Sequence, residues 1–201
     1  MSADPDKKRW PLALAEEVAH ELQERLEPFC VQSAVVGSVR RRKPLVGDVE
    51  ILLMPQYHDV PVDLYGATEP RTECFWAIDA LVREGWMGKR RKVDGSVSSW
   101  GERNRHAVHA GTGMPVDLFV GRPENWWSLM VCRTGPAALN IEIATQAKGR
   151  GLHWDPYRGL IQPGGRVVDL AGEAELFRAV GIAYATPMER EILWGRKAEQ
   201  H

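Results

Sequence analysis

Three acidic residues stand inside stretches of the sequence that are otherwise apolar. Asp48 and Glu50 lie two positions apart in GDVEILL, and Asp117 lies in MPVDLFV. Residues two apart in a β-strand point to the same face, so Asp48 and Glu50 project together while Val49 points into packing. A buried carboxylate is costly unless it is paired or coordinates a metal. The pattern therefore predicts a cation at this position, although an Asp-x-Glu pair taken alone is more often an exposed strand face.

Residues that suit phosphate precede these acids. Gly37 and Ser38 follow a predicted strand, and a turn there can direct backbone N–H groups at phosphate oxygens. The run Arg40 to Lys43 comes next, and guanidinium groups match the geometry of phosphate. Mg²⁺ takes carboxylates, phosphates and water as ligands, and two such ions about 4 Å apart can clamp the oxygens of an in-line displacement. The combination predicts a displacement at phosphorus with magnesium as the cofactor.

The elements that position these residues follow from apolar spacing and turn residues. Apolar residues recur at every fourth position from Leu14 to Leu26, which predicts a helix over 11–27 that ends before Pro28. The predicted strands are 31–36, 48–54 and a set of short antiparallel strands within 86–120. The other predicted segments are a loop at 55–70, helices at 72–84, 123–132, 136–148 and 173–180, a hairpin region at 151–170, and a charged tail from residue 187.

The order of these elements predicts an α+β fold with a catalytic domain at 1–121 and a smaller domain at 122–201. The chain has 201 residues, 44% of them apolar and 26% charged, which is ordinary for a water-soluble globular protein. A net charge of −1 excludes a global positive field, so a nucleic-acid partner has to be bound by local cationic patches. The three cysteines form no Cys-x-x-Cys pattern, which fits a reducing cytoplasm. No apolar run is long enough to span a membrane.

The arrangement of these motifs resembles the signature of the DNA polymerase beta (family X) nucleotidyltransferases. The matching core is GSVRR at 37–41, six further residues, DVE at 48–50, and the single acid of MPVDLFV far downstream. Two later segments resemble the family's nucleotide-covering helix and its Tyr-x-x-Pro-x-x-Arg ending, namely RTGPAALNIEIATQAKGRGL (133–152) and YATPMER (184–190). The resemblance extends over residues 11–190.

The resemblance implies a nucleotidyltransferase palm, with a mixed or antiparallel sheet and helices on one face, followed by a small helical and β-hairpin subdomain that covers the nucleotide. It implies an enzyme that adds a nucleotide from an NTP or dNTP to a nucleic-acid 3′-hydroxyl and releases pyrophosphate. The implied partners are that nucleotide and a DNA primer–template, the implied cofactor is a pair of Mg²⁺ ions with Mn²⁺ as a substitute, and the implied pathway is DNA repair. We expect a cytoplasmic monomer, in a minimal form without the family's N-terminal lyase and helix-hairpin-helix domains.

Roles carry over to the positions of this sequence that match the family's motifs. The resemblance implies that Asp48, Glu50 and Asp117 bind the two metal ions and that Asp117 lies nearest the primer 3′-hydroxyl. The implied nucleotide-binding residues are Gly37, Ser38, Arg41 and Gly47 at the triphosphate, Thr134 and Gly135 under the sugar, and Asn140 at the minor-groove edge of the new base pair. Weaker nucleic-acid contacts are expected from Arg40, Arg42 and Lys148.

The chain departs from the family at three places. Glu50 stands where the family usually has Asp. Cys132 and Arg133 replace two aromatic residues that exclude the ribose 2′-hydroxyl, and Ala144 replaces an arginine that contacts the template. We therefore expect altered discrimination between deoxyribose and ribose, and weaker checking of the template.

Two other functions are also compatible with the sequence. One is the transfer of a nucleotide to an RNA end, a small molecule or a protein, and the cationic runs at 89–92 and 148–150 favour a polyanionic acceptor. The other is a binding or scaffold protein that keeps the fold without the chemistry. All three predicted metal-binding positions are acidic, which favours an enzyme.

Overall fold

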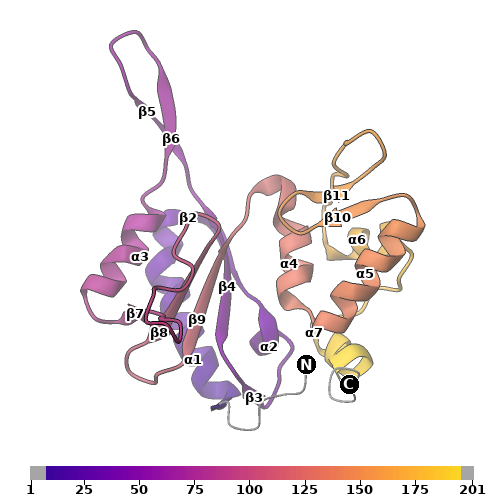
Figure 1. Ribbon diagram of the computed structural model, residues 1–201, viewed down its shortest axis with the longest axis horizontal. Coiled ribbons are helices and arrows are strands. Elements are labelled where there is room, and N and C mark those ends of the chain that lie inside the picture. Colours follow the sequence, from indigo (N-terminus) through magenta and orange to yellow (C-terminus); the bar gives the residue numbers. More distant parts are fainter. Residues whose placement is uncertain (1–7, 196–201) are drawn as a thin grey trace.

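The computed structural model of the protein describes residues 8–195. Its elements form two groups, a five-stranded sheet with its helices and a C-terminal group of helices with a small hairpin (Figure 1). The first group consists of β1 (Trp10–Pro11), α1 (Leu12–Leu26), η1 (Glu27–Phe29), β2 (Cys30–Val35), α2 (Gly37–Arg40), β3 (Leu45–Val46), β4 (Val49–Pro55), β5 (His58–Pro61), β6 (Thr68–Arg71), α3 (Cys74–Arg83), β7 (Met87–Lys89), β8 (Asn104–His109) and β9 (Pro115–Val120). The second consists of η2 (Pro123–Asn125), α4 (Trp126–Thr134), α5 (Ala137–Gly149), β10 (His153–Asp155), β11 (Gly159–Ile161), α6 (Glu173–Val180), α7 (Pro187–Arg190) and the π-helical turn η3 (Glu191–Gly195). The predicted α+β fold class is confirmed.

The strands of the central sheet are ordered β2-β4-β9-β8-β7. β8 is antiparallel to both β7 and β9, as predicted, whereas β9 runs parallel to β4. Between β4 and β9 the chain passes through α3, β7 and β8, and this long connection lets β9 enter the sheet in the same direction as β4. The sheet is therefore mixed, and its two central strands lie side by side in parallel.

The two faces of this sheet pack against different helices. Val49 and Leu53 of β4 lie in one buried cluster with residues of α1 and α3, which cover one face. Leu52 of β4 lies in a second buried cluster with residues of α4, which approaches the other face. Because side chains alternate along a strand, Glu50 shares the face of Leu52 and is directed to the side of the sheet on which the C-terminal group lies.

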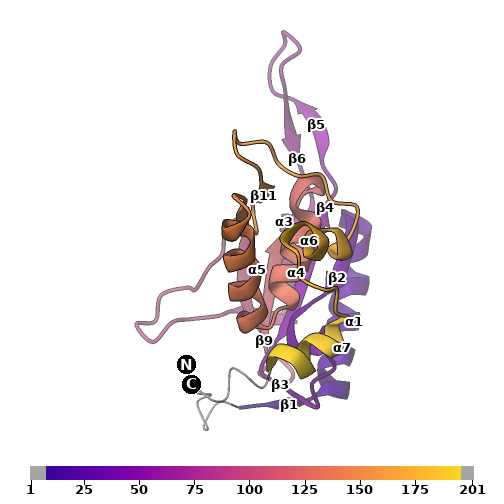
Figure 2. The ribbon, with the colours of Figure 1, turned by 90° about the vertical axis from the view of Figure 1, so that its right-hand side faces the viewer.

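The C-terminal group has a buried cluster of its own. It joins Val131 of α4, Ile143 of α5, Trp154 of β10, Phe177 of α6 and Trp194 of η3. In Figure 2, which views this group from the front, α5 lies to the left of α4 and α6 crosses in front of it. The predicted domain boundary at residues 121 and 122 falls in the connection between β9 and η2, and it stays a prediction.

The loop predicted at 55–70 contains a hairpin, in which β5 pairs with β6 and projects from the body of the protein (Figure 1). Asp63 closes its turn, because Oδ1 accepts hydrogen bonds from the backbone N–H groups of Tyr65 (2.8 Å) and Ala67 (3.0 Å). The polar strands of this hairpin lack the apolar alternation that identifies a strand in sequence. The connection between β7 and β8 projects in another direction, to the left in Figure 2.

Residues 187–195, predicted as part of a charged tail, are helical, and the rest of that predicted tail lies outside the described residues. Thr186 caps α7: its Oγ1 accepts a hydrogen bond from the Glu189 N–H, and the Glu189 carboxylate accepts one from the Thr186 N–H at 2.7 Å. This reciprocal pair is a capping box, and Pro187 occupies the first helical position, where proline is tolerated. None of the helices within residues 8–195 combines the length and apolar character that crossing a lipid bilayer requires.

Candidate active site

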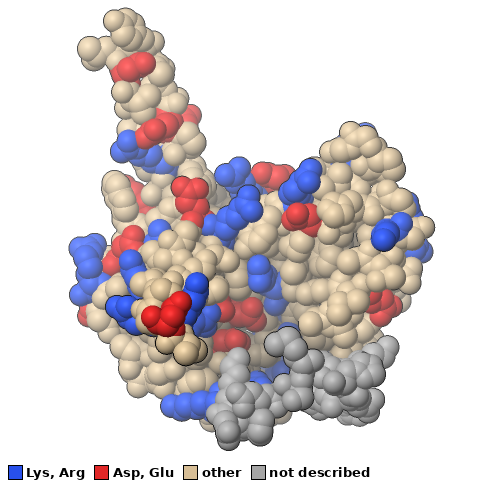
Figure 3. All heavy atoms as spheres, in the orientation of Figure 1, with Lys and Arg blue, Asp and Glu red and all other residues tan. Residues whose placement is uncertain are grey.

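Glu50 and Asp117 are direct neighbours in the sheet. They are register partners in the parallel pairing of β4 and β9, and adjacent strands lie about 4.8 Å apart. Asp48 immediately precedes β4, and both it and Glu50 are half-buried. The structure thus brings a carboxylate of each central strand to one face, as the sequence analysis expects. Figure 3 shows a group of acidic side chains near the centre of the viewed face of the molecule, with basic side chains on either side.

The close approach of these acids changes the ionisation of Glu50. Burial of its side chain, followed by the charges of Asp48 and Asp117, raises the pKa of Glu50 to about 8, against the opposing effect of Arg133 and Arg41. A pKa raised in this way indicates that several carboxylates lie close together and are partly shielded from water. It marks the position as one that a cation would stabilise.

The Gly-Ser turn lies directly against Glu50. Gly37 has a φ of +67°, and a Cβ at this position would overlap the Glu50 carboxylate, so only glycine leaves room for that side chain. The Val36 N–H donates to the Glu50 carbonyl at 2.9 Å, which joins the turn to β4. The hydroxyl of Ser38 is buried and has no hydrogen-bond partner among the described residues. It is therefore available to a ligand.

Asp117 has a protein cation beside it. The Arg90 Nη2 lies 2.9 Å from Asp117 Oδ1 in an ion pair, yet this buried oxygen receives no hydrogen bond of good geometry from the described residues. His106 is the register partner of Asp117 on β8, and Ser98 Oγ lies 3.0 Å from its Nδ1. Burial lowers the pKa of His106, the charge of Asp117 opposes this effect, and Arg90 and Arg133 add to it. The net lowering favours the neutral imidazole near this site.

The types of the candidate metal ligands suit a metal ion, but their positions in the structure do not yet form a metal site. Carboxylate oxygens are the ligands that Mg²⁺ prefers, and Asp48, Glu50 and Asp117 supply them on one face. In the part of the chain that the structure describes, no three His, Cys, Asp or Glu side chains are already placed so that they could hold a metal ion. The three carboxylates are suitable ligands for magnesium. One of them, Asp117, forms an ion pair with Arg90 instead.

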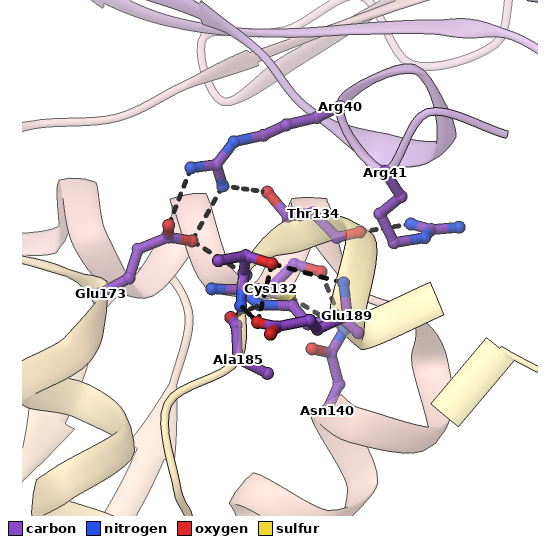
Figure 4. A network of polar contacts seen from close by, with 10 residues as sticks. Arg40, Arg41, Cys132, Thr134, Asn140, Glu173, Ala185 and Glu189 are labelled. Atoms are coloured by element: carbon purple, nitrogen blue, oxygen red, sulfur yellow. Dashed lines mark hydrogen bonds and ion pairs between the residues drawn. The ribbon is translucent and has the colours of Figure 1, made fainter. Parts of the chain in front are cut away.

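A buried ion-pair network connects the arginine run to the C-terminal group (Figure 4). The Arg40 guanidinium donates to both oxygens of Glu173, at 2.8 and 2.7 Å, and to Thr134 Oγ1 at 2.6 Å. Arg190, which is fully buried, donates to the same carboxylate at 2.9 Å. Burial acts to raise the pKa of Glu173, but the hydrogen bonds and charges of Arg40 and Arg190 outweigh it and lower that pKa. Arg40, expected to contact nucleic acid, thus binds the protein itself.

The other cations of the run also have protein partners. Arg41 donates from Nε to Glu191 Oε2 at 2.7 Å and from Nη1 to the Thr134 carbonyl. Lys43 lies 2.9 Å from Glu191 Oε1. Arg42 is exposed and pairs with Glu16 on α1.

The turn between α4 and α5 carries the remaining predicted nucleotide-binding residues. Thr134 ends α4, Gly135 follows with a φ of +62°, and the Gly135–Pro136 peptide bond is cis. The side-chain amide of Asn140 donates to the Cys132 carbonyl at 2.8 Å, and its Oδ1 is buried without a partner among the described residues. Lys148 is exposed on α5, and Gly47 is buried beside Asp48.

Several residues of this site could not be identified from the sequence. Arg133, treated there only as a replacement for an aromatic residue, has its guanidinium 3.8 Å from the Phe119 ring centroid and near Tyr157. Its charge acts on Glu50, and its Nε is buried without a partner in the described chain. Glu173 and Glu191 were missed because nothing in their local sequence indicates which cation they meet. Arg90 lies in the cationic run at 89–92, and that run was the one available signal.

Part of the chain matches a known protein family. Residues 129–191 match the family model of the DNA polymerase beta thumb. This segment is about a third of the chain and contains Thr134, Gly135 and Asn140 as well as Glu173 and Arg190 of the ion-pair network. A search of curated proteins gave no match to this chain. The thumb match supports a relationship to the family X polymerases and a thumb-like domain of the kind that binds DNA, and it does not extend to the three acids.

Proposed function

We propose that the protein is a metal-dependent nucleotidyltransferase resembling a minimal family X DNA polymerase. It adds a nucleotide from a dNTP or NTP to a nucleic-acid 3′-hydroxyl and releases pyrophosphate. The observation that carries this proposal is the register pairing of Glu50 with Asp117 beside the Gly37–Ser38 turn. The thumb match beginning on α4 supplies independent support, because α4 ends at the turn that Arg40 and Arg41 bind.

In the proposed reaction the protein binds and orients, and it forms no covalent intermediate. Ser38 and Arg41 bind the triphosphate, and the turn at Thr134 and Gly135 supports the sugar. Asp117 accepts the proton of the primer 3′-hydroxyl as that oxygen attacks phosphorus. Asp48, Glu50 and Asp117 would hold two Mg²⁺ ions, which when bound neutralise charge on the phosphates and the leaving pyrophosphate.

The proposed acceptor is the 3′ end of a DNA primer–template. Cations at 89–92 and at Lys148 provide local positive charge for a polyanion, while the net charge of the chain is −1. Binding of this kind is weakened strongly by salt, because it depends on the release of counterions. Transfer to an RNA end uses the same groups, and the replacement of the aromatic gate by Cys132 and Arg133 keeps ribonucleotides among the candidate substrates.

A second candidate is a nucleotide- or nucleic-acid-binding protein without catalysis. The specific observation in its favour is the ion pair of Arg90 with Asp117, together with the absence of a ready-made metal position among the described residues. In such a protein Arg90 would permanently replace the cation that catalysis needs. The two candidates make opposite predictions for primer extension.

The deciding experiment is extension of a gapped and an ungapped primer, with each dNTP and each rNTP offered singly in the presence of Mg²⁺. A template-directed polymerase prefers the complementary nucleotide. The substitution Asp117→Asn removes the charge at constant shape and should abolish extension while the melting temperature shows that the fold is kept. Extension that survives Asp117→Asn would refute the assignment, and absence of extension by the unaltered protein with Mg²⁺ or Mn²⁺ would favour the binding protein.

A further inference from the structure

Glu191 lies at the point where the proposed function requires a phosphate group. Its carboxylate binds two cations of the arginine run, with Oε2 2.7 Å from Arg41 Nε and Oε1 2.9 Å from Lys43 Nζ. The two cations therefore bind separate oxygens of one anionic group. A phosphate offers oxygens to a guanidinium and an ammonium in the same manner.

The surroundings of this contact contain polar groups that the protein leaves unused. The Ser38 hydroxyl, three residues before Arg41, is buried without a hydrogen-bond partner in the described chain. Arg133 Nε, in the residue before Thr134, is also buried without a hydrogen-bond partner in the described chain. Buried polar groups are nearly always satisfied in proteins, so these two atoms are candidates for hydrogen bonds with a polar ligand such as a phosphate.

The contact of Glu191 differs from the neighbouring contact of Glu173. The Glu173 side chain is 6% exposed and shares the fully buried Arg190, so this pair is enclosed by protein. The Glu191 side chain is 23% exposed, and its partner Lys43 is 30% exposed. Burial acts to raise the pKa of Glu191, but hydrogen bonds from Arg41 and Lys43 lower it overall, so the carboxylate is ionised. Glu191 is thus a charged, water-accessible group that another anion can replace.

We propose that the Glu191 carboxylate competes with the nucleotide for Arg41 and Lys43, so that the phosphates of the nucleotide displace it from these two side chains. This inference rests on the proposed function for the identity of the ligand, a nucleoside triphosphate. The consequence is that Glu191 lowers the affinity of the site for polyphosphate, because each binding event first separates an ion pair. Release of Glu191 also separates η3 from the segment that follows α2 whenever nucleotide is bound.

The test is the binding of inorganic tripolyphosphate to the full chain, measured by titration calorimetry without added metal. Glu191→Gln keeps the shape and removes the charge, and it should bind tripolyphosphate on the order of tenfold more tightly than the unaltered protein. Glu191→Asp keeps the charge on a shorter side chain and should fall between the two. Glu24→Gln, an equal change of charge on the exposed part of α1, is the control and should bind like the unaltered protein.

Other outcomes overturn the inference. If Glu191→Gln binds tripolyphosphate with unchanged or weaker affinity, or if neither protein binds it, then Glu191 only anchors the end of the chain. A Glu191→Gln protein that has lost its fold is recognised by its melting curve, and the comparison then rests on Glu191→Asp. Failure of the proposed function is distinguishable: a protein that never extends a primer can still show the tighter binding, and a polymerase can show unchanged binding.

Discussion

The guanidinium of Arg90 lies 2.9 Å from Oδ1 of Asp117, the carboxylate that the proposed reaction assigns to the primer 3′-hydroxyl. Arg90 follows β7 at the edge of the sheet, and its backbone N–H donates to the His106 carbonyl at 3.0 Å, so it is held in line with β8 and β9. A protein cation thus occupies the approach to one proposed metal ligand. Binding of a divalent ion requires that Arg90 move away from this oxygen.

Removing this cation is expected to strengthen metal binding. Arg90→Ala should bind Mn²⁺ several-fold more tightly than the unaltered protein, because Asp117 then loses its competing partner. Titration calorimetry with Mn²⁺ measures the change. Arg91→Ala is a matched control, since Arg91 lies in the same run, is exposed, and donates to the Gly95 carbonyl. Equal or weaker binding by Arg90→Ala would show that Arg90 positions Asp117 and does not compete.

The raised pKa of Glu50 predicts how stability depends on pH without metal. Its pKa is about 8 in the folded protein and 4.5 in an unfolded chain. Between these values the folded protein holds a proton that the unfolded chain has released, so the free energy of unfolding falls as pH rises from 4.5 to 8. Glu50→Gln should be the more stable protein at pH 8 and should lose most of this slope. Urea unfolding with a chelator, at several values of pH, provides the measurement.

Saturating Mg²⁺ should reverse that slope for the unaltered protein, since metal binds the ionised carboxylate and stabilises the folded state. Glu50→Gln should show a smaller response to Mg²⁺. Parallel stability profiles for the two proteins, with and without the metal, would be inconsistent with the position of Glu50 described here.

Breaking the buried network should cost far more stability than breaking a surface pair. Glu173→Gln leaves Arg190 buried without a full counter-charge, and removal of one partner of a buried pair typically costs about 3–5 kcal/mol. Glu69→Gln breaks the exposed pair with Arg71 on the β5–β6 hairpin and should cost less than about 1 kcal/mol. Urea unfolding curves compare the two. A loss for Glu173→Gln as small as that for Glu69→Gln would show that water reaches Arg190.

The thiols of Cys30 and Cys74 are placed to react with each other. Their sulfur atoms lie 3.8 Å apart, within hydrogen-bonding distance, and the interaction with Cys30 lowers the pKa of Cys74, which favours the thiolate on Cys74. Hydrogen peroxide should convert this pair into one disulfide, with loss of one hydrogen from each thiol and reduction of the peroxide to water. Peptide mass mapping should find Cys30 joined to Cys74 and Cys132 free. Cross-linking of Cys132, or a Cys74→Ser protein that still forms a disulfide within the chain, would contradict this.

Local periodicity was enough to predict most of the elements and the strand face that each acid occupies. Alternation along GDVEILL and MPVDLFV separates acids from apolar residues, and in the structure Val49 packs against α1 and α3 while Glu50 shares the opposite face with Asp117. Gly37 was also recognised as part of a turn after a strand, and the structure adds its positive φ and its contact with Glu50. These features depend on neighbours in sequence or on the fixed period of a strand, which is why they could be predicted.

Features that depend on nonlocal packing could not be predicted. The parallel direction of β9 follows from a long connection, and the β5–β6 hairpin is built from polar strands without an apolar period. The arginine run was recognised as cationic, yet its partners are decided by how the C-terminal helices pack against α2. Arg40 meets Glu173 across 133 residues of sequence, and Arg41 meets Glu191 across 150. Which residues carry charge, and which strand face they occupy, can be read from the amino-acid order. Which opposite charges meet depends on the folded chain, because ion-pair partners are brought together by the packing of distant segments.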